Sequence, residues 1–443
     1  MRTRSPDARG RSAPLAAASR TGRTSWRHAH TAVAGWAREM LPAPVLAAFA
    51  LSRLAFALAA AVDWWLVPRA PRWSGSIEPP VPAWLALHWR WDAVYYYTIA
   101  LGGYGASPVA APKVSAAEHL PAFFPLWPLL LRAAAWLATW PLAPAAVPFG
   151  AAPAPILAVG VLLTNLVALV AFRNLYALVA RETGDAAWAG RAVLYAALAP
   201  FAFCYAIPYT EGLFLATSTA AFLAARRGQW LRAGLWAGAA AATRSVGILL
   251  VPVLALELAL AWRRGALHGA ARWRAAGGLL LAPTGLLAFM LHLYRTVGDP
   301  LAWLHASQRF WHRDLVFPAV TVWRGLALAL QPARSASPVE YAVSLASTAL
   351  VCGALLILVA AWRRWPPSYG LYGALLFALL LATPLPGTRA MFGVARYLVI
   401  FFPLYGALAR WGARPVTHRA ILAVSLVGFT GFAALYVGWY FVG

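Results

Sequence analysis

The strongest candidate for a catalytic residue is Asp92, because of the aromatic rings around it. It lies directly after an apolar stretch, in a run of aromatic residues that includes Trp91, Tyr95 and Tyr96. A carboxylate packed among such rings is partly desolvated, which favours its neutral form and increases its basicity. That property suits a general base acting on a hydroxyl group, and the rings offer stacking faces to a substrate. Alternatively, the rings form a belt at a membrane surface and Asp92 caps a helix.

Glu211 and Arg244 each stand where two apolar segments meet with almost no loop between them. Glu211 follows Tyr209 and Thr210, and it is a second candidate for a catalytic carboxylate, with Tyr209 as a candidate substrate contact. Alternatively, Glu211 belongs to an N-cap turn and favours the positive end of the following helix. An arginine at the depth expected for Arg244 requires an anion, which could be Glu211 or a phosphate.

Two further arginines, Arg389 and Arg396, lie in a short loop between late apolar segments. The planar fork of a guanidinium can clamp a phosphate through paired hydrogen bonds. Each arginine could equally bind a lipid headgroup. We therefore predict Arg244, Arg396 and Arg389 as candidate phosphate contacts.

His119 precedes an aromatic run and is a candidate substrate contact, although a lone histidine in a loop more often has a structural role. The sequence has no His, Cys, Asp and Glu spacing typical of a zinc site. It also lacks a phosphate-cradling glycine loop and the serine nucleophile signature of hydrolases. We expect no metal and no cofactor.

The composition determines the class of protein that must position these residues. Hydrophobic residues make up 62% of the 443 positions and charged residues 11%, whereas a soluble domain has about a quarter charged residues. A membrane-crossing helix requires about 20 mostly apolar residues, and many windows meet that requirement. The sequence therefore predicts an all-α polytopic membrane protein. Both cysteines, Cys204 and Cys352, lie in apolar stretches, so no disulfide framework is expected.

The formal net charge of +24 comes almost wholly from arginines that cluster between apolar segments. This distribution is typical of cytoplasmic loops and suits anionic membrane lipids. It argues against nucleic acid as the partner, although a high positive charge alone would permit it.

The predicted organisation has two parts. Residues 1–42 are rich in arginine and lack an apolar period, so we expect a disordered cytoplasmic tail and not a signal peptide. Residues 43–443 form the membrane domain, with about eleven crossings and the large outer loops 63–122 and 295–340. The arginines predict a cytoplasmic loop from Arg173 to Arg191. Counting the apolar stretch Phe123–Trp140 as a full crossing would put this loop outside, so we expect that stretch to be interfacial or re-entrant. The stretch 315–331 poses the same problem, and we expect the same of it. The first crossing starts inside and the last ends outside.

Seven short elements occur in an order and spacing that resemble PIG-V-type mannosyltransferases of the bacterial branch. They cover most of the membrane portion, from about residue 50 to 410. The elements are Arg90–Ala93, the pair Ile99–Gly105 and Ala122–Leu129, Pro208–Phe214, Ala242–Gly247, Gly298–Trp303 and Ala395–Tyr397.

The resemblance implies a GT-C glycosyltransferase fold, in which the first extracytoplasmic loop carries the acidic catalytic residue. It also implies a polyprenyl-phosphate sugar as donor, and inversion without an obligatory metal. Carried over to this sequence, the Trp-Asp pair falls on Trp91 and Asp92, with Glu211 and Arg244 as further candidates. The acceptor, a lipid or a glycan, stays open. The composition is typical of bacteria, which predicts the plasma membrane with the active site outside.

These observations predict a glycosyltransferase in which Asp92 deprotonates the acceptor hydroxyl while Arg244 and Arg396 stabilise the departing phosphate. A transporter or flippase of a polyprenyl-linked or anionic substrate is the alternative. It would place ionisable groups at mid-membrane on discontinuous helices, whereas the candidates here gather at one face. A non-catalytic subunit of a larger complex is a third possibility.

Overall fold

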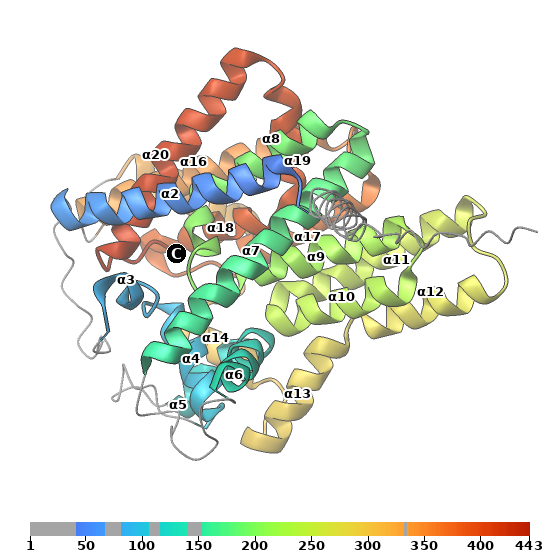
Figure 1. Ribbon diagram of the computed structural model, residues 1–443, viewed down its shortest axis with the longest axis horizontal. Coiled ribbons are helices and arrows are strands. Elements are labelled where there is room, and N and C mark those ends of the chain that lie inside the picture. Colours follow the sequence, from blue (N-terminus) through green and yellow to red (C-terminus); the bar gives the residue numbers. More distant parts are fainter. Residues whose placement is uncertain (1–40, 67–80, 106–115, 140–152, 332–334, 336) are drawn as a thin grey trace, which may run out of the picture. The chain divides into compact units, whose positions relative to one another are not determined.

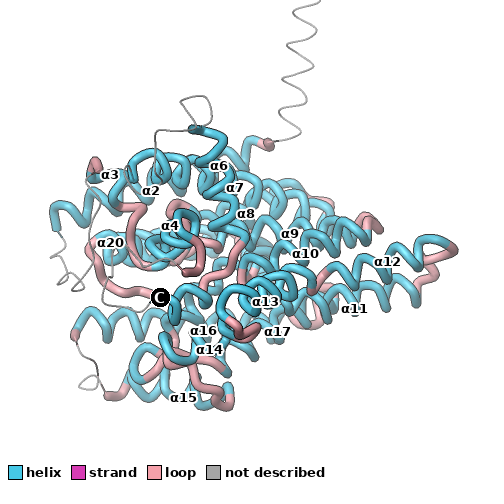
Figure 2. Tube along the Cα trace, turned by 90° about the horizontal axis from the view of Figure 1, so that it is seen from below, coloured by secondary structure: helices cyan, strands magenta, loops and turns pink. Residues whose placement is uncertain are grey.

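The computed structural model describes residues 41–66, 81–105, 116–139, 153–331, 335 and 337–443. Residues Pro44–Gly443 form one compact unit. The predicted tail, 1–42, lies outside the described residues except at its last two positions. All regular structure in the described ranges is helical, as Figure 2 shows. This confirms the all-α class.

Six helical segments are long and apolar enough to cross a membrane, which confirms a multi-pass membrane protein. They include continuous helices and pairs of shorter helices in one line. The segments are α2 (Ala43–Leu66), α7 (Pro153–Thr183), η4 with α11 (Ser245–Leu249 and Leu250–Arg263), α12 with α13 (Ala270–Leu281 and Thr284–Val297), α16 (Pro338–Ala361) and α20 (Pro415–Val437).

A bent pair of segments, Gly387–Ile400 and Phe402–Trp411, could be a seventh crossing, with an angle of 74° between its halves. The expected count of about eleven is not confirmed. The other apolar stretches form helices of 12 to 16 residues, which reach about 24 Å at 1.5 Å per residue, less than the roughly 30 Å of a bilayer's hydrocarbon core. These are α8 (Ala186–Ala197), α9 (Glu211–Arg226), α10 (Trp230–Thr243) and α17 (Pro367–Ala382).

The two predicted outer loops contain short helices of their own, and α6 follows the first loop. The stretches expected to be interfacial or re-entrant form α6 and α15, both too short to be candidate crossings. The elements are α3 (Ala83–Ala86), α4 (Asp92–Gly102), α5 (Ala116–His119), η1 (Leu120–Ala122), α6 (Leu126–Thr139), α14 (Ala302–Trp311) and α15 (Pro318–Ala329).

The structure differs from the sequence prediction at the first arginine-rich loop. We expected a loop from Arg173 to Arg191, but α7 continues through Arg173 to Thr183. The chain turns only at residues 184–185, because the Asp185 side chain accepts hydrogen bonds from the backbone N–H groups of Ala187 (2.7 Å) and Trp188 (3.0 Å). This N-cap starts α8.

Close packing holds α10, which ends directly before Arg244, against α12 and α13. Gly234 and Gly238 on α10 face the backbones of α12 and α13, and a Cβ atom at Gly234 would overlap the carbonyl oxygen of Gly278. Small residues at such spacing let membrane helices approach closely. Helices α9 and α10 lie side by side (Figure 1), so that the start of α9 and the end of α10 meet.

The remaining short elements bring the last part of the chain to the same place. They are η3 (Ala202–Tyr205), η6 (Gly387–Arg389), α18 (Phe392–Tyr397), η7 (Leu398–Ile400) and α19 (Phe402–Trp411). The carbonyl oxygen of Gly443 accepts a hydrogen bond of 2.7 Å from Arg396 on α18, and Figure 1 shows the C-terminus beside α18.

Candidate active site

Helix α4 begins at Asp92, and the residue before it has an unusual backbone. Trp91 adopts φ 51° and ψ −126°, a region that bulky residues rarely occupy. Its ring lies 6.0 Å from that of Trp439 and 5.4 Å from that of Phe441, measured between centroids. Backbone strain of this kind persists where the surrounding packing enforces it, often at functional sites.

The Asp92 carboxylate is buried, with 6% of the residue exposed. Its Oδ2 accepts a hydrogen bond of 2.8 Å from Nη1 of Arg396. The backbone N–H of Asp92 donates to the hydroxyl of Tyr209 over 3.3 Å. The N-cap position of α4 belongs to Trp91, and no side-chain cap is present there. The structure therefore does not support a helix cap as the role of Asp92.

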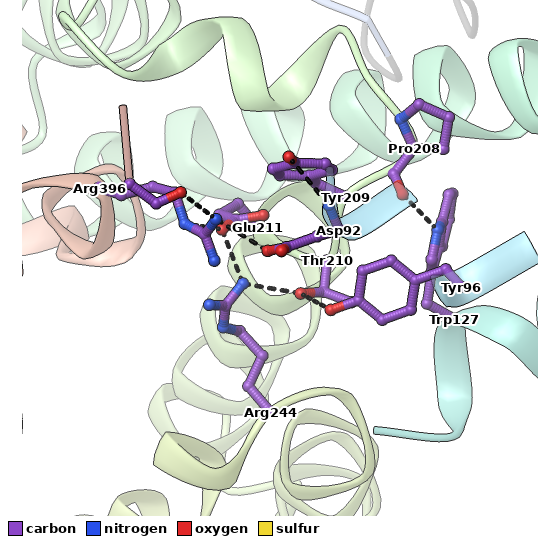
Figure 3. A network of polar contacts seen from close by, with 10 residues as sticks. Asp92, Tyr96, Trp127, Pro208, Tyr209, Thr210, Glu211, Arg244 and Arg396 are labelled. Carbon is purple, nitrogen blue, oxygen red and sulfur yellow. Dashed lines mark hydrogen bonds and ion pairs between the residues drawn. The ribbon is translucent and has the colours of Figure 1, made fainter. Parts of the chain in front are cut away.

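Glu211 is the first residue of α9 and is only 1% exposed. Its Oε1 lies 2.7 Å from Nη1 of Arg244 and 3.1 Å from Nε of Arg396. Arg396 thus bridges two carboxylates, as Figure 3 shows. Because two guanidiniums face two carboxylates, the buried network is neutral as a whole, and each ion retains a partner after its desolvation.

Neighbouring hydroxyl groups and rings hold both guanidiniums in place. Nη1 of Arg244 donates to Oγ1 of Thr210 (2.7 Å), which also lies 3.2 Å from the hydroxyl of Tyr96 (Figure 3). Cζ of Arg244 lies 4.2 Å from the centre of the Tyr397 ring. Burial raises the pKa of Tyr96, so its hydroxyl stays protonated.

A cavity of about 270 Å³ opens beside this network, near the lower end of the range for ligand pockets. Its charged wall consists of Asp92, Arg244, Arg313 and Arg396. Helix α14, in the second predicted outer loop, supplies part of the opposite wall. Polar and aromatic side chains that also line the cavity include those of Tyr96, Phe123, Trp303, Ser307, Gln308, Trp311, Tyr397 and Phe441.

Arg313 is a cavity residue that the sequence analysis did not single out. Its Nη1 donates to the carbonyl oxygen of Thr383 over 3.3 Å, and its Nη2 would lie 3.1 Å from a Cβ atom built at Gly393. Of the three arginines in the cavity wall, it alone has no carboxylate partner among the ion pairs of the described ranges. Burial lowers the pKa of Arg313, which means that burial disfavours its charge and that a bound anion would stabilise it.

Six of the residues predicted from the sequence do not line the cavity. Glu211 and Tyr209 bind the cavity residues Arg396 and Asp92, and Trp91 packs on Phe441.

The other three have the following contacts. Arg389 forms an ion pair of 3.0 Å with Glu340, and its side chain is half exposed. The ring of His119 packs on its neighbour Phe310, with centroids 4.3 Å apart. Tyr95 stacks on Phe123 at 4.5 Å, so it supports a wall residue from behind.

This placement gives a prediction for Arg389. The Arg389→Gln substitution should leave the rate of any reaction in the cavity within about twofold of wild type. A half-exposed ion pair contributes little, and Arg389 does not line the cavity, although its Cζ lies 6.0 Å from the ring of Phe441, which does. Steady-state rates of the purified variant would measure this. A loss of tenfold or more would restore Arg389 to the site.

No group of three or more His, Cys, Asp and Glu side chains that could hold a metal ion occurs in the part of the chain that the structure describes. The charged wall of the cavity contains one carboxylate and three guanidiniums. Such a wall attracts an anion and repels a cation, so phosphate is the ligand chemistry that it fits.

Comparison with known families gives one match. Residues 67–280 match the family model described as Mannosyltransferase (PIG-V). This region contains Asp92, Glu211 and Arg244, whereas Arg313 and Arg396 lie beyond it. The resemblance to PIG-V mannosyltransferases is thereby confirmed, and with the apolar helices it supports a membrane glycosyltransferase. No curated protein matches the chain.

Two solved structures with a similar chain course are oligosaccharyltransferases of Archaeoglobus fulgidus. The apo form has a TM-score of 0.42 and 13% identity, and the match covers 88% of this chain and 56% of that one. The archaeal oligosaccharyltransferase AglB, in complex with an inhibitory peptide and a dolichol-phosphate, has a TM-score of 0.38 and 13% identity, with 89% and 56% covered. The chain thus spans little more than half the length of these proteins, and the likeness concerns the fold alone.

Proposed function

We propose that this chain is a PIG-V-type mannosyltransferase that moves a sugar from a polyprenyl-phosphate donor to a hydroxyl group of a lipid or glycan acceptor. Asp92 is the general base, and the reaction takes place on the extracytoplasmic face. The observation that carries the proposal is the buried carboxylate of Asp92, held by Arg396 at the wall of a cavity whose other charged groups are guanidiniums.

In the proposed reaction the acceptor oxygen attacks the anomeric carbon of the sugar, and Asp92 takes the hydroxyl proton. The bond between the anomeric carbon and the phosphate oxygen breaks, and the phosphate leaves with the electron pair. The ion pair with Arg396 uses Oδ2 of Asp92, so Oδ1 is the oxygen that accepts the proton. Guanidiniums around the cavity stabilise the charge that develops on the phosphate.

The contacts of the three arginines give them different roles in stabilising the charge on the phosphate. Arg244 and Arg396 already bind Glu211 and Asp92, so they orient the carboxylates and contribute a positive field. Arg313 has its charge available on the cavity wall. We therefore assign the direct contact with the donor phosphate to Arg313. Trp303 and Trp311 on α14 then offer apolar faces to the sugar or to the first isoprenoid unit.

The Arg313→Gln substitution should raise KM for the polyprenyl-phosphate donor by about tenfold or more, because charge-assisted hydrogen bonds to phosphate are lost. KM for the acceptor should change little. Initial rates at varied donor concentration would measure the effect. The matched control is Arg309→Gln, an exposed arginine of α14, which should retain wild-type constants. Equal donor KM in both variants would contradict the assignment.

The choice of donor tests the proposed function. Purified protein in detergent would be given radiolabelled polyprenyl-phosphate mannose or GDP-mannose, each with a pool of bacterial lipids as acceptors. We expect label in the lipid product only from the polyprenyl donor. Transfer from GDP-mannose alone would contradict the proposed donor class.

A further inference from the structure

A second polar cluster lies at the opposite end of α9 from the candidate active site. Glu211 and Arg226 are the first and last residues of this helix, so they lie roughly 22 Å apart along its axis at 1.5 Å per residue. Arg226 forms ion pairs of 2.5 Å with Glu182 and with Glu257. The hydroxyl of Tyr369 donates to Glu182 over 3.0 Å. The proposed transfer reaction does not use Arg226, Glu182, Glu257 or Tyr369.

This cluster borders a cavity of about 510 Å³ between the ends of α7, α16 and α19 and the starts of α8 and α17. Its wall is aromatic and its charged lining consists of Glu182, Arg364 and Arg410. Glu182 is already bound by Arg226 and Tyr369. The aromatic residues are Trp188, Trp365, Tyr369, Phe402 and Trp411.

The charges around this cavity leave an excess of one cation. Two carboxylates, Glu182 and Glu257, share the guanidinium of Arg226, while Arg364 and Arg410 add two more positive charges. No carboxylate lies in an ion pair with Arg364 or Arg410 among the described parts of the chain. Cζ of Arg410 lies 6.0 Å from the ring of Trp188, which keeps the guanidinium at the cavity. An anion is the ligand that two such groups favour.

An apolar groove of about 350 Å³ lies along two of the same helices, α16 and α19. On α16, Ala361 lines the cavity and Ile357, one turn earlier, lines the groove; residues four apart share one helix face. On α19, Leu404 and Leu408 line the groove, and Trp411, three residues further on and on the same helix face, lines the cavity. An aromatic cavity with two guanidiniums, beside an apolar groove along the same two helices, matches a lipid headgroup followed by its chain.

We propose that this pair of spaces, the headgroup cavity and the apolar groove, binds an anionic phospholipid of the surrounding membrane. Arg364 and Arg410 hold the phosphate. The aromatic rings pack against the glycerol, as such rings do at membrane surfaces, and one acyl chain lies in the groove between α16 and α19. Basic pockets between membrane helices recognise anionic headgroups, and the site serves structure or regulation at a distance from the transfer reaction.

Native mass spectrometry of the delipidated full-length protein tests this proposal. The protein would be titrated with dioleoyl phosphatidylglycerol or dioleoyl phosphatidylcholine. We expect wild type to bind one phosphatidylglycerol with preference over phosphatidylcholine. The double variant Arg364→Gln/Arg410→Gln should bind it at least about tenfold more weakly, because two charge-assisted contacts are lost.

The matched control is Arg263→Gln/Arg419→Gln, which removes two exposed arginines that do not line the cavity. This variant should bind phosphatidylglycerol as wild type does. Equal weakening in both double variants would mean that only the net charge of the protein attracts the lipid, and would overturn the proposal.

A third variant tests the groove without changing a charge. Gly353 lines the groove, and a Cβ atom there meets open space, so Gly353→Leu should fold and fill it. We expect weaker binding of dioleoyl phosphatidylglycerol and unchanged binding of its dihexanoyl form. Displacement of the lipid by glycerol phosphate at equal concentration would identify a site for soluble phosphate and would also overturn the proposal.

Discussion

Replacing Asp92 with asparagine should reduce the turnover of sugar transfer by several hundredfold or more, within the 10²- to 10⁴-fold range of general-base catalysis. Asparagine cannot take the hydroxyl proton. Its carbonyl oxygen can still accept the hydrogen bond that Arg396 donates to Oδ2, so the fold should persist. The measurement is kcat at saturating donor and acceptor, with expression and thermal unfolding recorded in parallel.

The control for Asp92 is Asp185→Asn, because Asp185 is an exposed N-cap and asparagine caps a helix equally well. This variant should retain wild-type turnover. If Asp92→Asn kept more than about a third of the wild-type kcat, which is far above what the loss of a general base allows, Asp92 would leave the mechanism and Glu211 would become the candidate.

The Glu211→Gln substitution should have the largest effect on stability. Glu211 is 1% exposed and its Oε1 faces Arg244 and Arg396 at 2.7 and 3.1 Å. Removing its charge leaves Arg244 buried without an anion, and breaking a buried ion pair costs about 3–5 kcal/mol. Thermal unfolding in one detergent should show a clearly lower midpoint, and transfer should fall as Arg396 loses its alignment.

The matched substitution is Glu340→Gln, because Glu340 pairs with Arg389, whose side chain is half exposed. This pair should contribute about 1 kcal/mol or less, so the midpoint should hardly move. Similar midpoints for both variants would show that the Glu211 network does not stabilise the bundle.

Most charged residues of the site could be found in the sequence because they interrupt apolar surroundings, and Arg313 is the exception. Asp92, Glu211 and Arg244 stand at breaks between hydrophobic stretches, where a charge is costly unless it has a function or a partner. Their pairing could not be predicted. Arg396 is 304 positions from Asp92, and only the tertiary fold, in which α18 packs against α16 and α17, brings the two together.

Several other residues that line the cavity had no local signal in the sequence. Trp303, Arg313 and Phe441 belong to segments far apart in the sequence, and each resembles the many other tryptophans, arginines and phenylalanines of this chain. Arg389 is the opposite case, because it has a signal in the sequence but no place in the cavity. It has the residue type and the neighbourhood of a phosphate contact, but the Glu340 carboxylate at the start of α16 holds it outside the cavity.

The lengths of the helices also could not be predicted from hydrophobicity. The apolar stretches were identified, but a stretch of sequence does not reveal where a proline, a glycine or a buried charge divides it. Helix α9 begins at Glu211 and α10 ends before Arg244, so both stop where the site needs a charge. The same residues that carry the proposed chemistry therefore shorten the helices.

We propose that this chain transfers sugar and does not merely move lipid. The most direct test follows radiolabelled polyprenyl-phosphate mannose in proteoliposomes of the purified wild type, with bacterial lipid acceptors present, and measures both label in new glycolipid and label exchanged between leaflets. We predict label in the product, dependent on acceptor. Exchange of the donor between leaflets with no label in any product would contradict the account and favour a flippase.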